Sequence, residues 1–178
     1  MLALVQPVEP VSAIVVRVPV PRALARLRDR WDWAAGVGAP AHVTVLFPFL
    51  PVASLDVDVR RELASIAAAH EPFDVRYETI GRFPGIVYAA PEPATPFVRL
   101  TDAFAARYPS HPPYGGAHEE VIPHLTIVER QDAPLDAIAA EVSRALPFTH
   151  SVTALEVLIE GDDARWRGRW RLPLGVRR

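Results

Sequence analysis

The stretch "HVTVLFPF" at residues 42–49 alternates polar with apolar side chains at its start, and "PHLTIVER" at residues 123–130 repeats that alternation. Both runs are rich in β-branched and apolar residues, which predicts two β-strands. Side chains two positions apart on a strand point to the same face. The histidine and the threonine of each run should therefore share one face, opposite apolar residues that pack into the core.

Composition excludes several kinds of chemistry. The chain has 178 residues, half of them hydrophobic and 22% charged, which is typical of a globular domain with a substantial core. Its formal net charge of −2 gives no overall basic excess for binding duplex DNA. The absence of cysteine excludes disulfides, thiolate zinc sites and cysteine nucleophiles. All 19 basic residues are arginine, so any cation that binds a phosphate has to be arginine or protonated histidine.

The sequence also predicts where the protein works and how its chain is organised. No apolar run approaches the roughly 18 residues of a membrane span, and the N-terminus lacks the basic start of a signal peptide. We therefore expect a cytoplasmic protein, a monomer with no membrane partner. Strands are expected over 12–18, 42–49, 73–83, 85–90, 121–130, 150–161 and 165–174. Helices are expected over 21–31, 55–73, 95–108 and 133–146.

An internal repeat accompanies this order of elements. "IVVRVPVPRALARLRD" from Ile14 resembles "IVYAAPEPATPFVRLTD" from Ile86, and each segment precedes one of the two histidine-containing strands. The period is longer than that of solenoid repeats, which favours two related lobes. We expect one bilobal α+β domain over 1–178, with the repeat at approximately 12–85 and 86–174. Each pseudo-symmetric lobe should be an antiparallel-rich sheet with helices on its outer face, and the two His-x-Thr strands should line a central cleft.

Such a cleft would hold two imidazoles and two hydroxyls, from His42, Thr44, His124 and Thr126. Imidazole titrates near neutral pH, so one ring can accept a proton while the other, protonated, donates one. Hydroxyl groups and imidazolium also donate hydrogen bonds to phosphoryl oxygens. Two histidines on opposite sides of a phosphorus atom are therefore suited to in-line displacement without a metal ion or other cofactor.

With these motifs the chain resembles the 2H phosphoesterase superfamily, and within it the 2'-5' RNA ligase and cyclic phosphodiesterase branch. The resemblance rests on "HVTV" and "HLTI", their spacing, Pro123 and the order of elements, and it spans about residues 12–173. It implies metal-independent hydrolysis of RNA 2',3'-cyclic phosphates or 2'-5' phosphodiester bonds, with reverse 2'-5' ligation in some members. It implies catalytic roles for His42, Thr44, His124 and Thr126.

Four further residues are candidates for substrate binding by their position. Tyr114, in a glycine-rich loop, is suited to stack on an unpaired base. Arg82 and Phe83 lie at the predicted hairpin around Pro84–Gly85, and Arg130 shares the face of His124 if its strand stays regular. The expected partners are RNA ends or a small nucleotide.

Alternatives remain open from sequence alone. One is a phosphodiesterase that acts on a small cyclic nucleotide or an ADP-ribose-type cyclic phosphate. Another is a noncatalytic module that binds RNA or a nucleotide. A zinc site in "HPPYGGAHEE" is less favoured, because the spacing matches no helix or hairpin geometry; its candidate ligands are His111, His118, Glu119 and Glu120. The alternating "RWRGRWR" at 165–171 favours a hairpin strand with Trp166 and Trp170 inward over a nucleic-acid platform.

Overall fold

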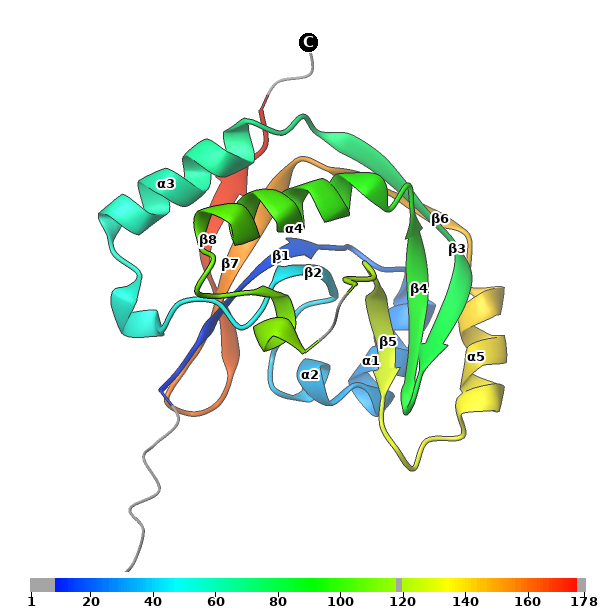
Figure 1. Cartoon of the computed structure of the whole chain (residues 1–178). Helices are drawn as coiled ribbons and strands as arrows, with labels where there is room; N and C mark the ends of the chain where they lie inside the picture. Colours follow the sequence, from blue (N-terminus) through cyan, green and yellow to red (C-terminus); the bar gives the residue numbers. More distant parts are fainter. Residues whose placement is uncertain (1–8, 118–119, 176–178) are drawn as a thin grey trace, which may run out of the picture.

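Eight strands form one curled antiparallel sheet in the computed structural model, which describes residues 9–117 and 120–175 (Figure 1). Their order across the sheet is β6-β3-β4-β5-β2-β1-β7-β8. The strands are β1 (Ser12–Arg17), β2 (His42–Leu46), β3 (Phe73–Phe83), β4 (Ile86–Glu92), β5 (Leu125–Glu129), β6 (Phe148–Val152), β7 (Ala154–Glu160) and β8 (Trp166–Pro173). The predicted α+β class is confirmed.

Four helices pack against the outer side of this sheet, α1 (Arg22–Trp31), α3 (Val57–Ala68), α4 (Thr95–Arg107) and α5 (Leu135–Arg144) (Figure 1). The short helix α2 (Trp33–Gly36) packs on α1, and there are two 3-10 helices, η1 (Val52–Ser54) and η2 (Pro113–Gly116). Helices α1 and α5 contact β3, β4 and β5, whereas α3 and α4 contact β2 and β8. Within the described part of the chain, no helix is long and apolar enough to cross a bilayer.

The sheet has two four-stranded halves that meet at β2 and β5. Among the described residues, only Val43 and Leu125 pair across this junction. A strand that leaves its neighbour exposes backbone groups that need other partners. Beyond the junction, the Thr101 hydroxyl of α4 donates a buried hydrogen bond of 2.9 Å to the Val45 carbonyl oxygen. The two motif strands can therefore separate without leaving that carbonyl unsatisfied.

The two halves of the sheet differ in which parts of the chain form them. One half holds β2, β1, β7 and β8, and the other holds β5, β4, β3 and β6. The helices cross between halves, since α1 follows β1 but packs on β5, and α4 follows β4 but packs on β2. The half with β3 to β6 is formed by one continuous stretch, residues 73–152, whereas the half with β1, β2, β7 and β8 combines strands that precede and follow that stretch.

The observed elements depart from the predicted ones at three places. The strand expected over 121–130 begins only at Leu125, because Pro123 has no N–H to donate to a neighbouring strand. The strand expected over 150–161 is two strands, β6 and β7, that lie in different halves of the sheet. Helix α2 was not predicted, since four residues give too short a pattern to detect.

Candidate active site

The two motifs alternate in burial as their sequences predict. Val43 and Val45 are buried in the core, whereas His42 and Thr44 are half-buried on the opposite face. The second motif repeats this burial pattern residue by residue, from His124 to Val128. The period of a strand therefore places both His-Thr pairs on the same side of the sheet, away from the helices.

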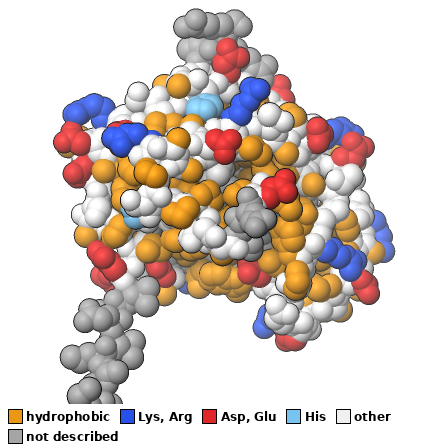
Figure 2. Space-filling model, in the orientation of Figure 1, with side chains coloured by type: hydrophobic (Ala, Val, Ile, Leu, Met, Phe, Trp, Pro, Cys, Tyr) orange, Lys and Arg blue, Asp and Glu red, His pale blue; other side chains and the backbone are white. Residues whose placement is uncertain are grey.

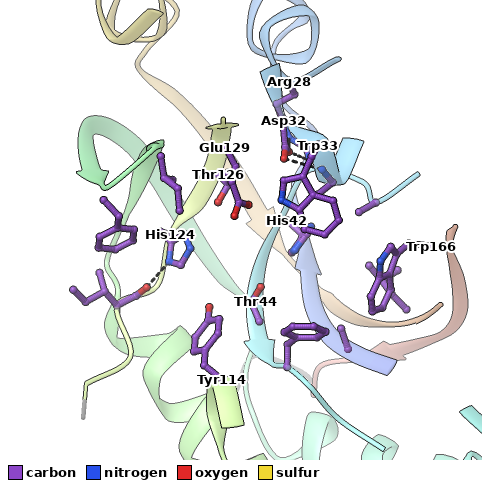
Figure 3. Close-up of a pocket in the computed structure, with 18 of the residues that line it drawn as sticks. Arg28, Asp32, Trp33, His42, Thr44, Tyr114, His124, Thr126, Glu129 and Trp166 are labelled. Atoms are coloured by element: carbon purple, nitrogen blue, oxygen red, sulfur yellow. Dashed lines mark hydrogen bonds and ion pairs between the residues drawn. The ribbon is translucent and has the colours of Figure 1, made fainter. Parts of the chain in front are cut away.

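That side of the sheet carries a cavity of about 660 Å³, a size typical of a small-molecule site. Figure 3 shows His42 and His124 on opposite sides of it. Figure 2 shows hydrophobic side chains gathered in the middle of this face, with arginines mostly toward its periphery. Its polar and aromatic lining includes Arg28, Asp32, Trp33, His42, Thr44, Phe47, Phe83, Tyr114, Glu120, His124, Thr126, Glu129 and Trp166.

Both motif histidines use the same ring atom to hold their orientation. In each case Nδ1 lies 2.7 Å from the carbonyl oxygen two residues earlier, that of Pro40 for His42 and that of Ile122 for His124. A carbonyl oxygen can only accept, so Nδ1 carries the hydrogen in both rings. The neutral form of each imidazole therefore has an unprotonated Nε2, the atom that can accept a proton from a reactant.

The electrostatic surroundings of the two rings differ. Burial lowers the pKa of His42, and the Arg28 guanidinium lowers it further, against opposing contributions from the Pro40 carbonyl and Asp32. Burial also lowers the pKa of His124, but there the Ile122 carbonyl and the Glu129 carboxylate oppose it. Both rings therefore favour the neutral form, and His124 has the neighbour that favours its charge.

Aromatic rings support His124. The Phe83 ring meets it edge-on at 5.3 Å, and the Tyr88 ring lies tilted at 5.4 Å between centroids. Phe83 and Tyr88 also stack on each other at 4.7 Å. Tyr88 lies across Gly81, where a β-carbon would overlap its ring. The glycine thus makes room for the ring that fixes His124.

An ion pair inside the cavity wall accompanies His42. Arg28 Nη2 donates to Asp32 Oδ2 at 2.6 Å, and Arg28 Nε donates to the same oxygen at 3.0 Å. Both side chains are buried, with 7% and 1% of their surface exposed. Asp32 Oδ1 accepts the Ala34 N–H at 3.1 Å, which caps α2. The pair is thus held at the end of α1, with most of its charge neutralised internally.

A β-bulge follows the threonine in each motif strand. Val15 pairs with Thr44 and Ile14 with Leu46, so β2 has an extra residue opposite β1. In β5, Tyr88 pairs with Thr126 and Val87 with Val128, so the same extra residue occurs there. A bulge reverses the facing of every later residue. Phe47 and Glu129, each five residues after its histidine, consequently face the cavity.

Tyr114 reaches the cavity from an unusual backbone conformation. Its φ of 51° lies in the left-handed region, which is uncommon outside glycine. Its N–H donates to the Phe47 carbonyl oxygen at 2.6 Å, which ties η2 to the end of β2. Burial raises the pKa of the Tyr114 hydroxyl, while its hydrogen bond with the Thr44 hydroxyl opposes the rise. Backbone strain at a cavity residue is often associated with function.

The structure divides the four predicted substrate-binding residues. Phe83 and Tyr114 line the cavity with the two motifs. Arg82 lies outside the lining and pairs with Asp136 of α5 at 2.6 Å. Arg130 also lies outside it and pairs with Asp132 at 3.1 Å, because the bulge turns Glu129 inward instead. The assumption of a regular strand was therefore wrong for this position.

The loop that suggested zinc ligands is only partly described. His111 lies edge-on to Phe49, with 6.1 Å between ring centroids, and Glu120 lines the cavity. His118 and Glu119 are outside the described residues. No group of three or more His, Cys, Asp or Glu side chains suited to a metal occurs in 9–117 and 120–175.

Several cavity residues were missed from sequence. Arg28, Asp32 and Trp33 belong to a segment that reads as an ordinary helix end, although Trp33 is 58% exposed at the cavity. Phe47 and Glu129 were missed because bulges have no reliable sequence signal. Trp170 packs against the main core as expected, whereas Trp166 lines the cavity and lies edge-on to Phe47 at 6.0 Å.

Comparisons with known proteins agree with this fold. A crystal structure of E. coli LigT with phosphate matches at 16% identity with a TM-score of 0.54, over 94% of this chain and 99% of that one. A crystal structure of TT0787 from Thermus thermophilus matches at 18% identity with a TM-score of 0.62, over 94% of this chain and 100% of that one. A crystal structure described as a phosphoesterase matches at 15% identity with a TM-score of 0.55, over 94% of this chain and 99% of that one. None of the curated proteins compared with the chain matches it.

The sequence comparison covers most of the chain as well. Residues 16–164 match the profile of the 2'-5' RNA ligase superfamily, a region that includes both histidine motifs and most of the cavity lining. Fold and family together support a phosphoesterase of the 2H type. The chain belongs to the 2'-5' RNA ligase superfamily.

Proposed function

We propose that this protein is a metal-independent phosphodiesterase that opens 2',3'-cyclic phosphates, or cleaves 2'-5' phosphodiester bonds, with His42 and His124 as its acid and base. The observation that carries the proposal is the matched pair of imidazoles, each with Nδ1 bound to a carbonyl oxygen at 2.7 Å and each lining the same cavity. This arrangement leaves Nε2 of both rings available for proton transfer.

The chemistry needs one histidine neutral and one protonated. The neutral ring takes a proton from water as its oxygen attacks phosphorus, and the charged ring protonates the ribose oxygen that leaves. Thr44 and Thr126, on the same face as the histidines, are suited to donate hydrogen bonds to the phosphoryl oxygens. With a 5'-hydroxyl in place of water, the same groups can form a bond from its oxygen to the phosphorus of a 2',3'-cyclic phosphate while the bond to the 3' oxygen breaks, which would be 2'-5' ligation.

A small substrate is the second candidate, and the charges of the cavity favour it. The lining contains one arginine among its described residues, Arg28, and Asp32 already binds it. The remaining charged groups, Glu120 and Glu129, are acidic. RNA presents a negative charge at every nucleotide and is usually bound by several cations. A cyclic mononucleotide, with one phosphate and an aromatic base, suits this mostly apolar cavity better.

The relatives fit either candidate. LigT has been crystallised with phosphate and with 3'-AMP, so that protein binds both a free phosphate group and a mononucleotide. Here, Phe47 and Trp166 on one side and Phe83 on the other offer aromatic surface near the two histidines. We propose that the base of the substrate rests on one of these surfaces while the phosphate lies between the rings.

A substrate panel with matched variants tests the function. Purified protein should hydrolyse 2',3'-cyclic AMP in the presence of EDTA, and His42→Ala and His124→Ala should each lose about 10²–10⁴-fold in kcat. His150→Ala is the control, because His150 lies on β6 outside the cavity, and it should keep its activity. Full activity in either motif variant, or loss of activity with EDTA, would contradict the mechanism.

The same assay separates small substrates from RNA. We expect kcat/KM for 2',3'-cyclic AMP to equal or exceed that for an oligonucleotide that ends in a cyclic phosphate, with little dependence on salt. A preference of about tenfold or more for the oligonucleotide that disappears at high salt would indicate RNA binding through backbone phosphates instead. 2'-5' oligoadenylate serves as the third substrate, for the linear bond.

A further inference from the structure

The two motif strands differ at one cavity-facing position. Both have the same burial pattern and the same bulge, so Phe47 and Glu129 occupy equivalent places in the two strands. Phe47 packs edge-on against Trp166 and makes that wall of the cavity apolar. Glu129 instead brings a carboxylate to the wall that holds His124 (Figure 3). The site is therefore symmetric in its backbone but not in its charge.

No arginine among residues 9–117 and 120–175 neutralises the Glu129 carboxylate. It is half-buried, and in the described part of the chain no ion pair or hydrogen bond involves its side chain. The arginine of the cavity, Arg28, donates two hydrogen bonds to Asp32. The backbone of Glu129 is itself fixed, because it bridges to Asp32 and pairs with Ile86 of β4. A half-buried carboxylate without a cation favours a positive charge on its neighbours.

We propose that Glu129 is a positioning residue that assigns the two proton-transfer roles: it favours the protonated form of His124, which donates its proton to the leaving oxygen, and His42, beside Arg28, is the neutral base. This assignment rests on the proposed function. In hydrolysis, a water oxygen bonds to phosphorus and its proton moves to His42 Nε2. The bond from phosphorus to one ribose oxygen breaks, and that oxygen takes the proton of His124 Nε2. Exchange with solvent then restores both rings.

The other ionisable groups around His124 do not reverse this assignment. From β2, His42 is the opposing ring, and from α1 the Arg28–Asp32 pair is neutral overall and acts on His42. Tyr114 of η2 keeps its proton, because burial raises its pKa. Glu120 lines the cavity but is exposed, and it is also negative. The electrostatic interaction with Glu129 raises the pKa of His124, against the effect of burial, as the geometry predicts.

Glu129→Gln tests the proposal, because it removes the charge and keeps the shape. The pH profile of kcat/KM should be bell-shaped, with the neutral base governing the acidic limb and the protonated acid the alkaline limb. In Glu129→Gln we expect the alkaline limb alone to move to lower pH. At pH 7.5 kcat/KM should fall about tenfold, and at pH 5.5 by less than about twofold. Glu129→Asp should restore part of the loss.

A second measurement does not depend on turnover. In an NMR titration of the imidazole signals, assigned with His42→Ala and His124→Ala, the pKa of His124 should fall in Glu129→Gln. Glu92→Gln, at the exposed end of β4, carries the same charge change and should leave it in place.

Two results would overturn the assignment. One is a His124 titration that does not change in Glu129→Gln. The other is a shift of the acidic limb instead of the alkaline one, which would make His124 the base. If the wild-type protein hydrolysed none of the substrates, the proposed function would fail, whereas the NMR titration would still decide whether Glu129 favours the charge of His124.

Discussion

The two histidine motifs share one backbone design and have different surroundings. Each ring donates Nδ1–H to the carbonyl oxygen two residues earlier, at 2.7 Å in both. Beyond that contact they diverge, because a buried Arg28–Asp32 pair accompanies His42 while two aromatic rings and the Glu129 carboxylate accompany His124. The backbone thus gives the two histidines the same orientation and tautomer, and the side chains around them make their affinities for a proton unequal.

The largest expected effect is on stability, and it comes from the buried Arg28–Asp32 ion pair beside His42. Asp32→Ala leaves the buried Arg28 guanidinium without a partner, which should lower the free energy of unfolding by about 3–5 kcal/mol. Urea unfolding of the wild type and the variant measures this change in the free energy of unfolding. Asp58→Ala is the control, since its pair with Arg61 is about three-quarters exposed and should contribute less than about 1 kcal/mol.

A double variant distinguishes the role of charge from that of packing. Arg28→Met with Asp32→Leu removes both charges and keeps apolar volume, so it should be more stable than Asp32→Ala alone. If Asp32→Ala unfolded no more easily than the exposed control, the pair would not be a structural requirement of the His42 side.

Beside His124, stability should depend on the packing of aromatic rings instead. Gly81→Ala places a β-carbon against the Tyr88 ring, so we expect a loss of about 1–3 kcal/mol in the free energy of unfolding. Because Tyr88 contacts His124, kcat should fall as well, while Gly168→Ala, where a β-carbon meets nothing within 4 Å, should change neither. Unchanged activity in Gly81→Ala would show that Tyr88 does not position His124.

The smallest expected effect is on the pH dependence of stability. Both histidines have pKa values below 6.5 in the folded state, so the unfolded chain takes up protons first as the pH falls. The free energy of unfolding should therefore be highest above pH 6.5 and decline toward pH 5. His42→Gln should remove more of this decline than His124→Gln, because burial and Arg28 oppose the charge of His42, with Asp32 offsetting only part of that, whereas Glu129 favours the charge of His124.

Urea unfolding at pH 5.5, 6.5 and 7.5 measures this difference between the two sides. Inorganic phosphate should oppose the decline, since an anion between the rings favours their protonation. Phosphate that stabilises the protein equally at pH 5.5 and 7.5 would show that it does not bind between the histidines.

The sequence by itself determined the class of the fold, the two motifs and the face they share. A strand has a period of two, so alternation alone separates His42 and Thr44 from Val43 and Val45. The phosphoesterase family followed from the same residues, and its profile matches 16–164. These features are local, and local geometry is what residue patterns encode.

Only the tertiary structure decided which other residues join the motifs. The bulges turned Glu129 inward and Arg130 outward, and they depend on pairing with β4 and β1, which neither strand specifies alone. Arg28 and Asp32 reach the cavity because α1 crosses to β5 in the other half of the sheet. Contacts between distant segments set these positions, so the charge around each histidine could not be predicted from the sequence around it.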